Sequence, residues 1–154
     1  MDNGKIIIRR AKTEDIPEII KIEKEIFDDP WHKDSFYEAI FLFPGLFFVA
    51  VKDSEITGFL TGGIEDTGEE KYGHIMNIGT KKSHQGEGIG SLLIKRLEYE
   101  LILLGVSGIQ LEVRVSNTGA QEFYKKLGFC DVFVISEYYS DGEDALLMGF
   151  WFDK

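Results

Sequence analysis

The chain has 154 residues, of which 44% are hydrophobic, so it can bury one substantial core but not two of ordinary size. Asp and Glu outnumber Lys and Arg by 27 to 17, and the net charge of −10 argues against a nucleic-acid partner that is bound through its phosphates. No apolar run approaches the roughly 18 residues that a membrane helix requires, so no membrane partner is expected.

Cysteine use and the N-terminal residues predict where the protein works. Cys130 is the only cysteine, so no disulfide can form within the chain, and the three scattered histidines make no zinc framework. Residues 1–5 lack the apolar segment of a signal peptide. We therefore expect a cytoplasmic location, no required metal and a single domain over residues 1–154, because no linker or repeat interrupts the chain.

The first half of the chain predicts short strands and two helices. Apolar residues at helical spacing indicate a helix that Thr13 caps and that runs to Ile26. The sequence Asp-Asp-Pro-Trp at 28–31 then breaks this pattern. The complete prediction for this half is a strand at 6–10, the helix to Ile26, a helix at 33–43 and hairpin strands at 46–51 and 56–64.

The second half predicts a strand, a helix and then further strands around a shorter helix. Residues 109–115 alternate strictly, which places Gln110, Glu112 and Arg114 together on a polar face. The complete prediction is a strand at 74–80, a helix from Ile89 to Leu104, the strand at 109–115, a helix at 117–127 and a final pair of strands at 129–137 and 145–152.

Three glycines, Gly86, Gly88 and Gly90, lie between the predicted strand at 74–80 and the helix that follows. Glycines let a backbone approach a ligand closely, and the free N–H groups of a helix N-terminus attract phosphate. The spacing fits neither the dinucleotide fingerprint nor the P-loop. The pattern indicates an anion site, and the alternative is a turn that only begins a helix.

Five segments carry a resemblance to a known family. They are Gln85-x-x-Gly88-x-Gly90, the strand and helix motifs at 111–117 and 123–129, the segment from Tyr138 to Ala145, and the sequence at 27–31. Together they resemble the GNAT superfamily of N-acetyltransferases, and in particular the archaeal and eukaryotic protein N-terminal acetyltransferases and the bacterial ribosomal-protein alanine acetyltransferase. The resemblance implies an α/β (α+β) fold, with a mixed, mostly antiparallel central sheet, splayed middle strands and helices on both faces.

The resemblance also implies acetyl-CoA as co-substrate. Family members commonly carry arginines where Gln85 and Gly86 stand, so binding here is expected to rest on backbone amides, while Glu87 adds a negative charge nearby. Lysines at 81, 82, 125 and 126 are the cations available for phosphate groups. The expected cofactor contacts are Asn77, Ile78, Gly79, Gln85, Gly86, Glu87, Gly88, Ile89, Gly90, Asn117 and Tyr124.

Candidate catalytic groups follow from the chemistry of acetyl transfer to an amine, which needs a proton acceptor and a proton donor. The resemblance favours Glu112 as a general base, acting directly or through water; the alternative is an ion pair with Arg114 on the same strand face. Tyr124 is the candidate acid, or else a core tyrosine. His74 is a secondary candidate, because it could meet Glu112 if their strands are neighbours.

The expected substrate is the N-terminal α-amine of a protein or peptide, attacked in a ternary complex. Asp28 and Asp29 are candidates for selecting the residue after the amine, and Tyr138 and Tyr139 for lining the peptide path. Alternatives are a lysine or polyamine substrate on the same fold, and a coenzyme A-binding module without turnover. The resemblance leaves room for an auxiliary ribosome-anchoring subunit, and the sequence leaves the oligomeric state open.

Overall fold

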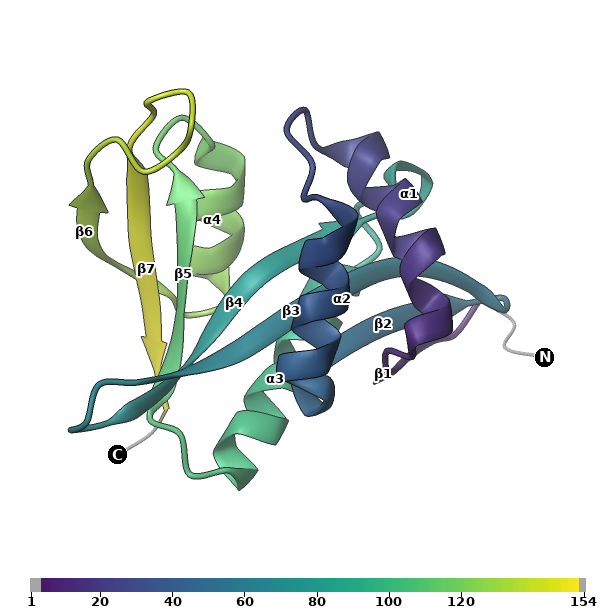
Figure 1. Ribbon diagram of the computed structural model, residues 1–154, viewed down its shortest axis with the longest axis horizontal. Helices are drawn as coiled ribbons and strands as arrows, with labels where there is room; N and C mark the ends of the chain where they lie inside the picture. The colour runs from purple at the N-terminus through teal and green to yellow at the C-terminus, as the bar shows by residue number, and fades with distance from the viewer. Residues whose placement is uncertain (1–3, 153–154) are drawn as a thin grey trace. The chain divides into compact units, whose positions relative to one another are not determined.

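The computed structural model describes residues 4–152 (Figure 1). The strands are β1 (Ile6–Arg10), β2 (Phe47–Lys52), β3 (Glu55–Asp66), β4 (Lys71–Thr80), β5 (Gly108–Arg114), β6 (Cys130–Ile135) and β7 (Ala145–Trp151). The helices are α1 (Ile16–Ile26), α2 (Lys33–Leu42), α3 (Ile89–Leu103) and α4 (Thr118–Lys126), with short 3-10 turns at Thr13–Asp15, Pro44–Leu46 and Lys82–His84. Every strand and helix expected from the sequence is therefore present.

The strands form one sheet in the order β1-β2-β3-β4-β5-β7-β6. The pairs β1/β2, β2/β3, β5/β7 and β6/β7 are antiparallel, whereas β4 and β5 are parallel. This parallel pairing is short, with Gly73 opposite Ile109 and His74 opposite Gln110, as splayed middle strands require. The predicted mixed, mostly antiparallel sheet is thus confirmed.

The chain divides into two compact units, which are described separately. The first unit runs to Gly63 and also contains Ile75–Leu104, and the second comprises Ile64–His74 and the chain from Gly105 onward. β3 and β4 therefore run through both units. The single domain expected for residues 1–154 stays a prediction.

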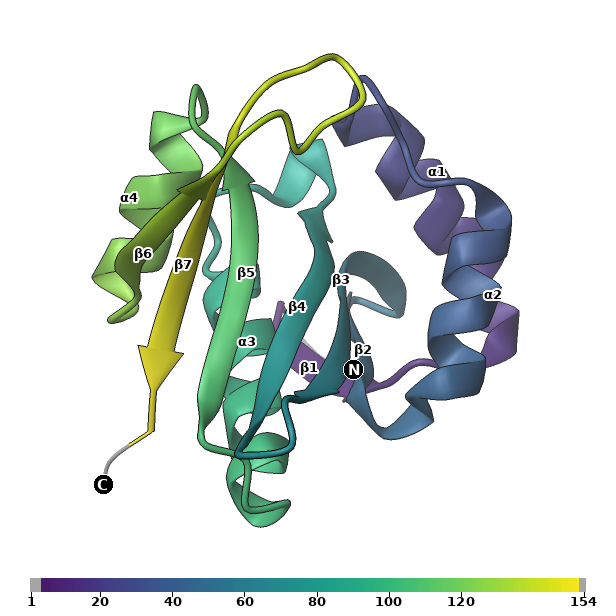
Figure 2. The same ribbon diagram turned by 60° about the vertical axis from the view of Figure 1, so that its left-hand side comes forward.

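In the first unit, helices cover both faces of the strands. α1 and α2 lie on one face of β2 and β3 and α3 lies on the other (Figures 1 and 2). Gly58 and Gly62 face α3, and a Cβ atom on either would meet α3 side chains at 3.0 Å or less. Because both faces are covered, β2 is a continuous apolar run. The core under α1 and α2 is Ala11, Ile16, Ile19, Ile22, Phe36, Ala39, Phe47, Val49 and Phe59.

The start of α1 differs from the prediction that Thr13 caps it. Thr13 begins a 3-10 turn, and α1 starts only at Ile16. The carboxylate of Asp15 organises this turn, because it accepts a hydrogen bond from the backbone N–H of Lys12 at 2.7 Å and pairs with Arg9 at 2.7 Å. A buried, ion-paired aspartate thus replaces the expected threonine cap.

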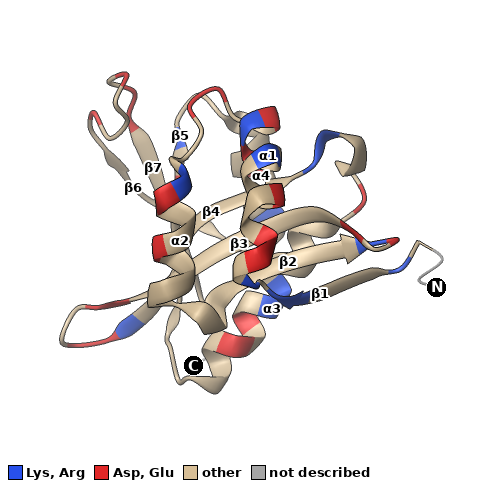
Figure 3. Cartoon of the chain, turned by 45° about the vertical axis from the view of Figure 1, so that its right-hand side comes forward, with Lys and Arg blue, Asp and Glu red and all other residues tan. Residues whose placement is uncertain are grey.

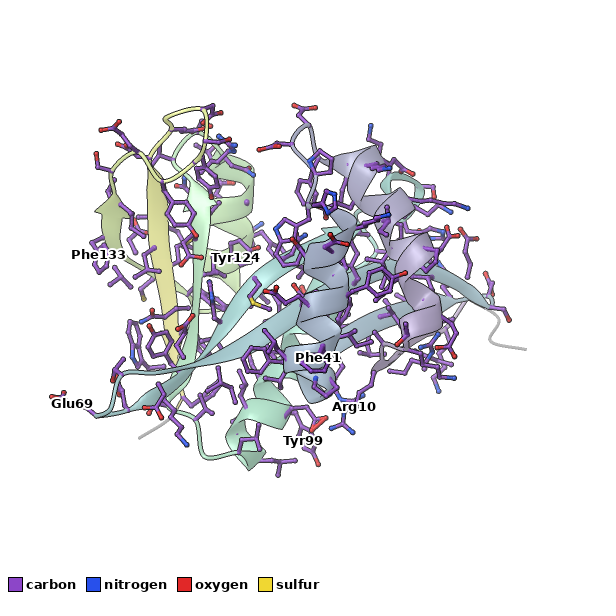
Figure 4. All side chains as sticks on the ribbon, in the orientation of Figure 1. Arg10, Phe41, Glu69, Tyr99, Tyr124 and Phe133 are labelled. Carbon is purple, nitrogen blue, oxygen red and sulfur yellow. The ribbon has the colours of Figure 1, made fainter. Side chains whose placement is uncertain are left out.

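In the second unit, α4 packs on one face of β5, β7 and β6 (Figure 1). Tyr124 of α4 contacts Phe129, and Phe129 contacts Phe150 of β7, with ring centroids 5.6 Å apart in both pairs. Phe133 of β6 points to solvent and is 56% exposed (Figure 4). Among the described residues, no helix is long and apolar enough to cross a bilayer.

The start of β5 requires a residue without a side chain. Gly108 lies opposite Trp151, and a Cβ atom there would come within 2.4 Å of the backbone oxygen of Phe150. We predict that Gly108→Ala lowers the free energy of unfolding by about 1–3 kcal/mol, because strand backbones must move apart to accept the methyl group.

Denaturant unfolding measures this effect. The matched control is Gly45→Ala, since a Cβ atom at Gly45 meets nothing within 4 Å. The control is expected to change the free energy of unfolding by no more than about 0.5 kcal/mol. Equal stability of the two variants would contradict the prediction.

Candidate active site

The polar face of β5 meets the first half of β4 at His74, in the second unit. His74 lies opposite Gln110 in the parallel pairing, which brings the imidazole to the next polar residue of the strand, Glu112. The distance from His74 Nε2 to Glu112 Oε1 is 2.7 Å, and from His74 Nδ1 to Glu65 Oε1 it is 3.3 Å. The structure therefore joins His74 and Glu112 and adds Glu65, which the sequence analysis did not identify.

The two carboxylates change the proton affinity of His74. Burial alone lowers the pKa of His74, but the hydrogen bond and charge of Glu112, with the charge of Glu65, outweigh burial and raise the net pKa above its ordinary value. The imidazole therefore stays protonated to higher pH than a free histidine. Its contribution to stability is fully present below the ordinary pKa and is lost as the pH rises through the raised one.

Arg114 does not pair with Glu112, so the alternative of an ion pair along β5 is wrong. Its guanidinium contacts Asp141 at 2.9 Å and Glu143 at 2.8 Å, and it lies over the ring of Tyr139, 4.0 Å from the centroid. Hydrogen bonds from Ser116, together with Arg114, lower the pKa of Glu143 to about 2. Arg114 thus holds the segment between β6 and β7 in place, and the carboxylate of Glu112 contacts His74 instead.

The segment between β6 and β7 carries the two candidate substrate tyrosines. The rings of Tyr138 and Tyr139 meet edge to face, with centroids 5.0 Å apart. Burial, followed by the charge of Glu112, raises the pKa of Tyr138. Burial also raises the pKa of Tyr139, to about 12. Both phenols are therefore neutral hydrogen-bonding groups at physiological pH, and Tyr138 lies within electrostatic range of Glu112.

Tyr124 lies in α4, and Asn117 is the N-cap residue of that helix. Tyr124 is 8% exposed, and burial raises its pKa to about 12 (labelled in Figure 4). The side chain of Asn117 accepts a hydrogen bond from the backbone N–H of Ala120 at 3.1 Å, so it caps the helix as one interpretation of the sequence expected. Tyr124 is both a core residue and a phenol that keeps its proton.

The glycine turn of the first unit has the geometry of an anion site. Gly86 and Gly88 adopt φ angles of 84° and 82°, and a Cβ atom on either would meet nothing within 4 Å, so the backbone is open on that side. Gly88 precedes α3 as its N-cap, and no side chain caps the helix. The first-turn N–H groups of this 15-residue helix are thus left for a ligand, and a pyrophosphate fits this donor set.

The negative charge that Glu87 was expected to add beside the glycine turn is paired with basic side chains. Glu87 Oε1 lies 2.8 Å from Lys52 Nζ and 3.1 Å from His84 Nδ1. These contacts lower the pKa of Glu87, so the carboxylate stays ionised and paired. Of the lysines considered for phosphate groups, Lys81 is paired with Glu55. The lysine that contacts the glycine turn through Glu87 is Lys52, which lies 35 residues away from Glu87 in the sequence.

The expected cofactor strand and substrate loop also lie in the first unit. The side-chain amide of Asn77 donates to Glu23 at 2.8 Å, so contacts of this residue with a cofactor are left to its backbone. Gly79 faces Ile26 of α1 and Phe59 of β3, which leave no room for a side chain. Asp28 and Asp29 are exposed between α1 and α2. Both acidic side chains are therefore accessible to solvent.

Comparison with known proteins identifies the family of the chain. A model of the acetyltransferase (GNAT) family matches residues 16–129. The chain belongs to the GNAT acetyltransferase family. The matched residues contain the glycine turn, His74, Glu112 and Tyr124, and acetyl-CoA is the acetyl donor of this family.

Two similar proteins are named as N-acetyltransferases. An N-alpha-acetyltransferase of Sulfurisphaera tokodaii is 35% identical over 150 residues, covering 92% of this chain and 90% of that protein. A putative ribosomal protein bS18-alanine N-acetyltransferase of Bacillus subtilis is 34% identical over 146 residues, covering 94% of each chain. The resemblance seen in the sequence is therefore confirmed, and the protein is an N-acetyltransferase.

Solved structures confirm the GNAT fold. Ard1 from Thermoplasma volcanium superposes with a TM-score of 0.90 at 23% identity, covering 97% of this chain and 99% of that chain. A chain of the NatC complex, solved with Gag peptide and CoA, superposes with a TM-score of 0.88 at 18% identity, covering 96% and 99%.

The raised pKa of His74 can be measured directly. We predict that Glu112→Gln lowers the pKa of His74 and that Glu65→Gln lowers it less, because the contact with Glu112 is shorter and includes the hydrogen bond. NMR titration of the imidazole signals follows each variant. Glu69→Gln is the matched control, since Glu69 is exposed in the turn between β3 and β4. An unchanged His74 titration in Glu112→Gln would contradict the assignment.

Proposed function

We propose that this GNAT enzyme transfers the acetyl group of acetyl-CoA to the N-terminal α-amine of proteins, by direct attack of the amine in a ternary complex. The observation that carries the proposal is the 2.7 Å contact between His74 Nε2 and Glu112 Oε1, which provides a paired proton acceptor on the matched part of the chain. The choice of an α-amine is supported by the relative named as an N-alpha-acetyltransferase.

Glu112 acts as general base, with His74 as its partner. An N-terminal α-amine has a pKa of about 7.7–8.0, so much of it is protonated at neutral pH and must lose a proton before attack. Glu112 accepts that proton, directly or through water. His74 orients the carboxylate through the 2.7 Å contact between its Nε2 atom and Glu112 Oε1.

Tyr124 acts as general acid. Its pKa of about 12 keeps the proton on the phenol until a base forms nearby. A departing thiolate ordinarily has a pKa of about 8.5, and the transfer would be uphill in water. The pKa of about 12 for Tyr124 already includes the effect of burial, whereas the pKa of about 8.5 is that of a thiol in water. Exclusion of water raises the pKa of the thiol, which brings the two values closer together.

The first unit binds the co-substrate. When bound, acetyl-CoA supplies an activated acetyl thioester. The backbone N–H groups from Gln85 to Gly90 donate to its pyrophosphate, while the ion pair with Lys52 compensates the negative charge of Glu87 beside them. Backbone groups of Asn77, Ile78 and Gly79 hold the pantetheine arm and the thioester carbonyl, because the side-chain amide of Asn77 is already taken by Glu23.

The substrate class is tested with peptides. Purified protein is incubated with acetyl-CoA and a library of peptides with free or blocked N-termini, and products are identified by mass spectrometry. Acetylation of free N-termini alone supports the proposal, whereas acetylation of blocked peptides on lysine, or of polyamines only, would replace it. Turnover by the chain alone also shows that no auxiliary subunit is required; such a subunit is proposed only if activity depends on one.

The base assignment predicts a pH-dependent loss of rate. In Glu112→Gln we expect kcat/KM to fall by about 100-fold, most strongly at low pH, where the amine is protonated and a base is needed. Affinity for acetyl-CoA should stay unchanged by calorimetry, because Glu112 is assigned to the amine. A loss of cofactor affinity in proportion to rate would show that Glu112 has a different role.

The paired Glu87 predicts an effect on cofactor affinity. Lys52→Met leaves the carboxylate of Glu87 without its lysine partner beside the glycine turn, and we expect the Kd for CoA to rise about three- to tenfold. Adding Glu87→Gln in the same protein should restore the affinity. Lys95→Met on the exposed side of α3 is the control, and calorimetry measures all four proteins. Equal affinities of Lys52→Met and the control would contradict the assignment.

A further inference from the structure

Glu23 is the buried charged residue of α1. Glu23 is 2% exposed, whereas the other charged residues near it on the helix, Lys21, Lys24 and Glu25, are exposed. Figure 3 shows basic and acidic residues along α1. Within residues 4–152, no lysine, arginine or histidine forms an ion pair with Glu23. Burial raises the pKa of Glu23. A buried carboxylate without a counter-ion costs stability, so its presence needs a reason other than stability.

Each oxygen of the Glu23 carboxylate accepts one hydrogen bond from a different segment. Oε1 accepts from the side-chain amide of Asn77 on β4 at 2.8 Å, and Oε2 accepts from the backbone N–H of Trp31 at 2.9 Å. The backbone oxygen of Glu23 also accepts from the N–H of Phe27 at 3.0 Å. One residue therefore closes the loop from Phe27 to Trp31 at both ends and ties it to β4.

The partners of Glu23 are themselves held in place. The ring of Trp31 packs on Phe36 of α2, with centroids 5.1 Å apart, and Phe36 is fully buried. The backbone oxygen of Asn77 accepts from the hydroxyl of Thr61 at 3.4 Å. Because both donors are fixed, a group that accepts from both of them sets the distance between the loop and the strand. A carboxylate can do this, whereas an amide offers one acceptor and one donor group.

We propose that Glu23 is a positioning residue that holds the loop carrying Asp28 and Asp29 in register with the strand Asn77–Gly79. The inference deepens the proposed function and rests on it, because that function assigns the loop to the substrate and the strand to the co-substrate. Glu23 touches neither ligand. Its effect is on the binding of the peptide, through the loop.

A reciprocal exchange of functional groups tests the proposal. In Glu23→Gln, the new NH2 group faces one of the two donors, the Trp31 N–H or the Asn77 amide, and cannot accept a hydrogen bond from it. In Asn77→Asp, the new carboxylate faces the carboxylate of Glu23. Each single variant therefore loses a hydrogen bond. In the double variant, the introduced amide donates to the introduced carboxylate, and its oxygen accepts from the Trp31 N–H. Charge and shape are thereby conserved. Glu18→Gln, the same change at a solvent-accessible position of α1, is the control.

Two measurements are made on each protein. Hydrogen exchange of the Trp31 amide reports the loop anchor, and steady-state kinetics with a peptide separates KM from kcat. We expect each single variant to speed exchange at Trp31 and to raise the peptide KM about tenfold. In Glu23→Gln, whose residue touches neither ligand, kcat and CoA affinity should change less than about twofold. The double variant should recover both values, and the control should match the unmodified protein.

Two results would overturn the proposal: a double variant no better than the single variants, or single variants that lose protection at Trp31 without a change in peptide KM. The exchange measurement is independent of the substrate. If the unmodified protein acetylates no peptide, the proposed function fails. Loss of protection in the single variants and recovery in the double variant would then still support the anchor, and the absence of that pattern would overturn it.

Discussion

The parallel pairing of β4 with β5 is the constraint on which the arrangement around Glu112 depends. His74 lies opposite Gln110, and because side chains alternate along a strand, Glu112 is the next residue on the same face. On its other side β5 is held by β7, in a register that runs from Gly108 opposite Trp151 to Arg114 opposite Ala145. A shift of one residue would turn Glu112 to the opposite face and separate it from the imidazole.

The two charged residues on the polar face of β5, Glu112 and Arg114, have different partners. Arg114 is taken by Asp141 and Glu143, so it does not draw Glu112 away from His74. At the glycine turn, Lys52 pairs with Glu87 in a comparable way. Although the chain has a net charge of −10, the carboxylates at these positions each contact a basic side chain, which compensates part of their charge locally.

Local patterns in the sequence predicted the strands, the helices, the glycine turn and the polar face that carries Glu112. These features depend on residues close in sequence, through alternation, helical spacing and the backbone freedom of glycine. The start of α1 was predicted wrongly because the cap preference of Thr13 is weaker than the ion pair that Asp15 makes with Arg9. That pair depends on where β1 ends relative to the turn.

The contacts missing from the sequence analysis join residues far apart in the chain. Lys52 and Glu87 are separated by 35 residues, and Glu23 and Asn77 by 54. No periodicity connects such positions, since their proximity follows from strand register and helix packing. His74 and Glu112, 38 residues apart, could be suggested only as a pair that would meet if their strands were neighbours.

The loop that Glu23 closes at both ends has a consequence for how related enzymes can diverge. Its hydrogen bonds to Glu23 use backbone N–H groups at Phe27 and Trp31, whereas Asp28 and Asp29 expose their side chains to solvent. Substitutions at these two positions therefore leave the backbone path unchanged. Selection can alter the residues presented by the loop one at a time, while the stability of the fold and the geometry of the neighbouring strand are preserved.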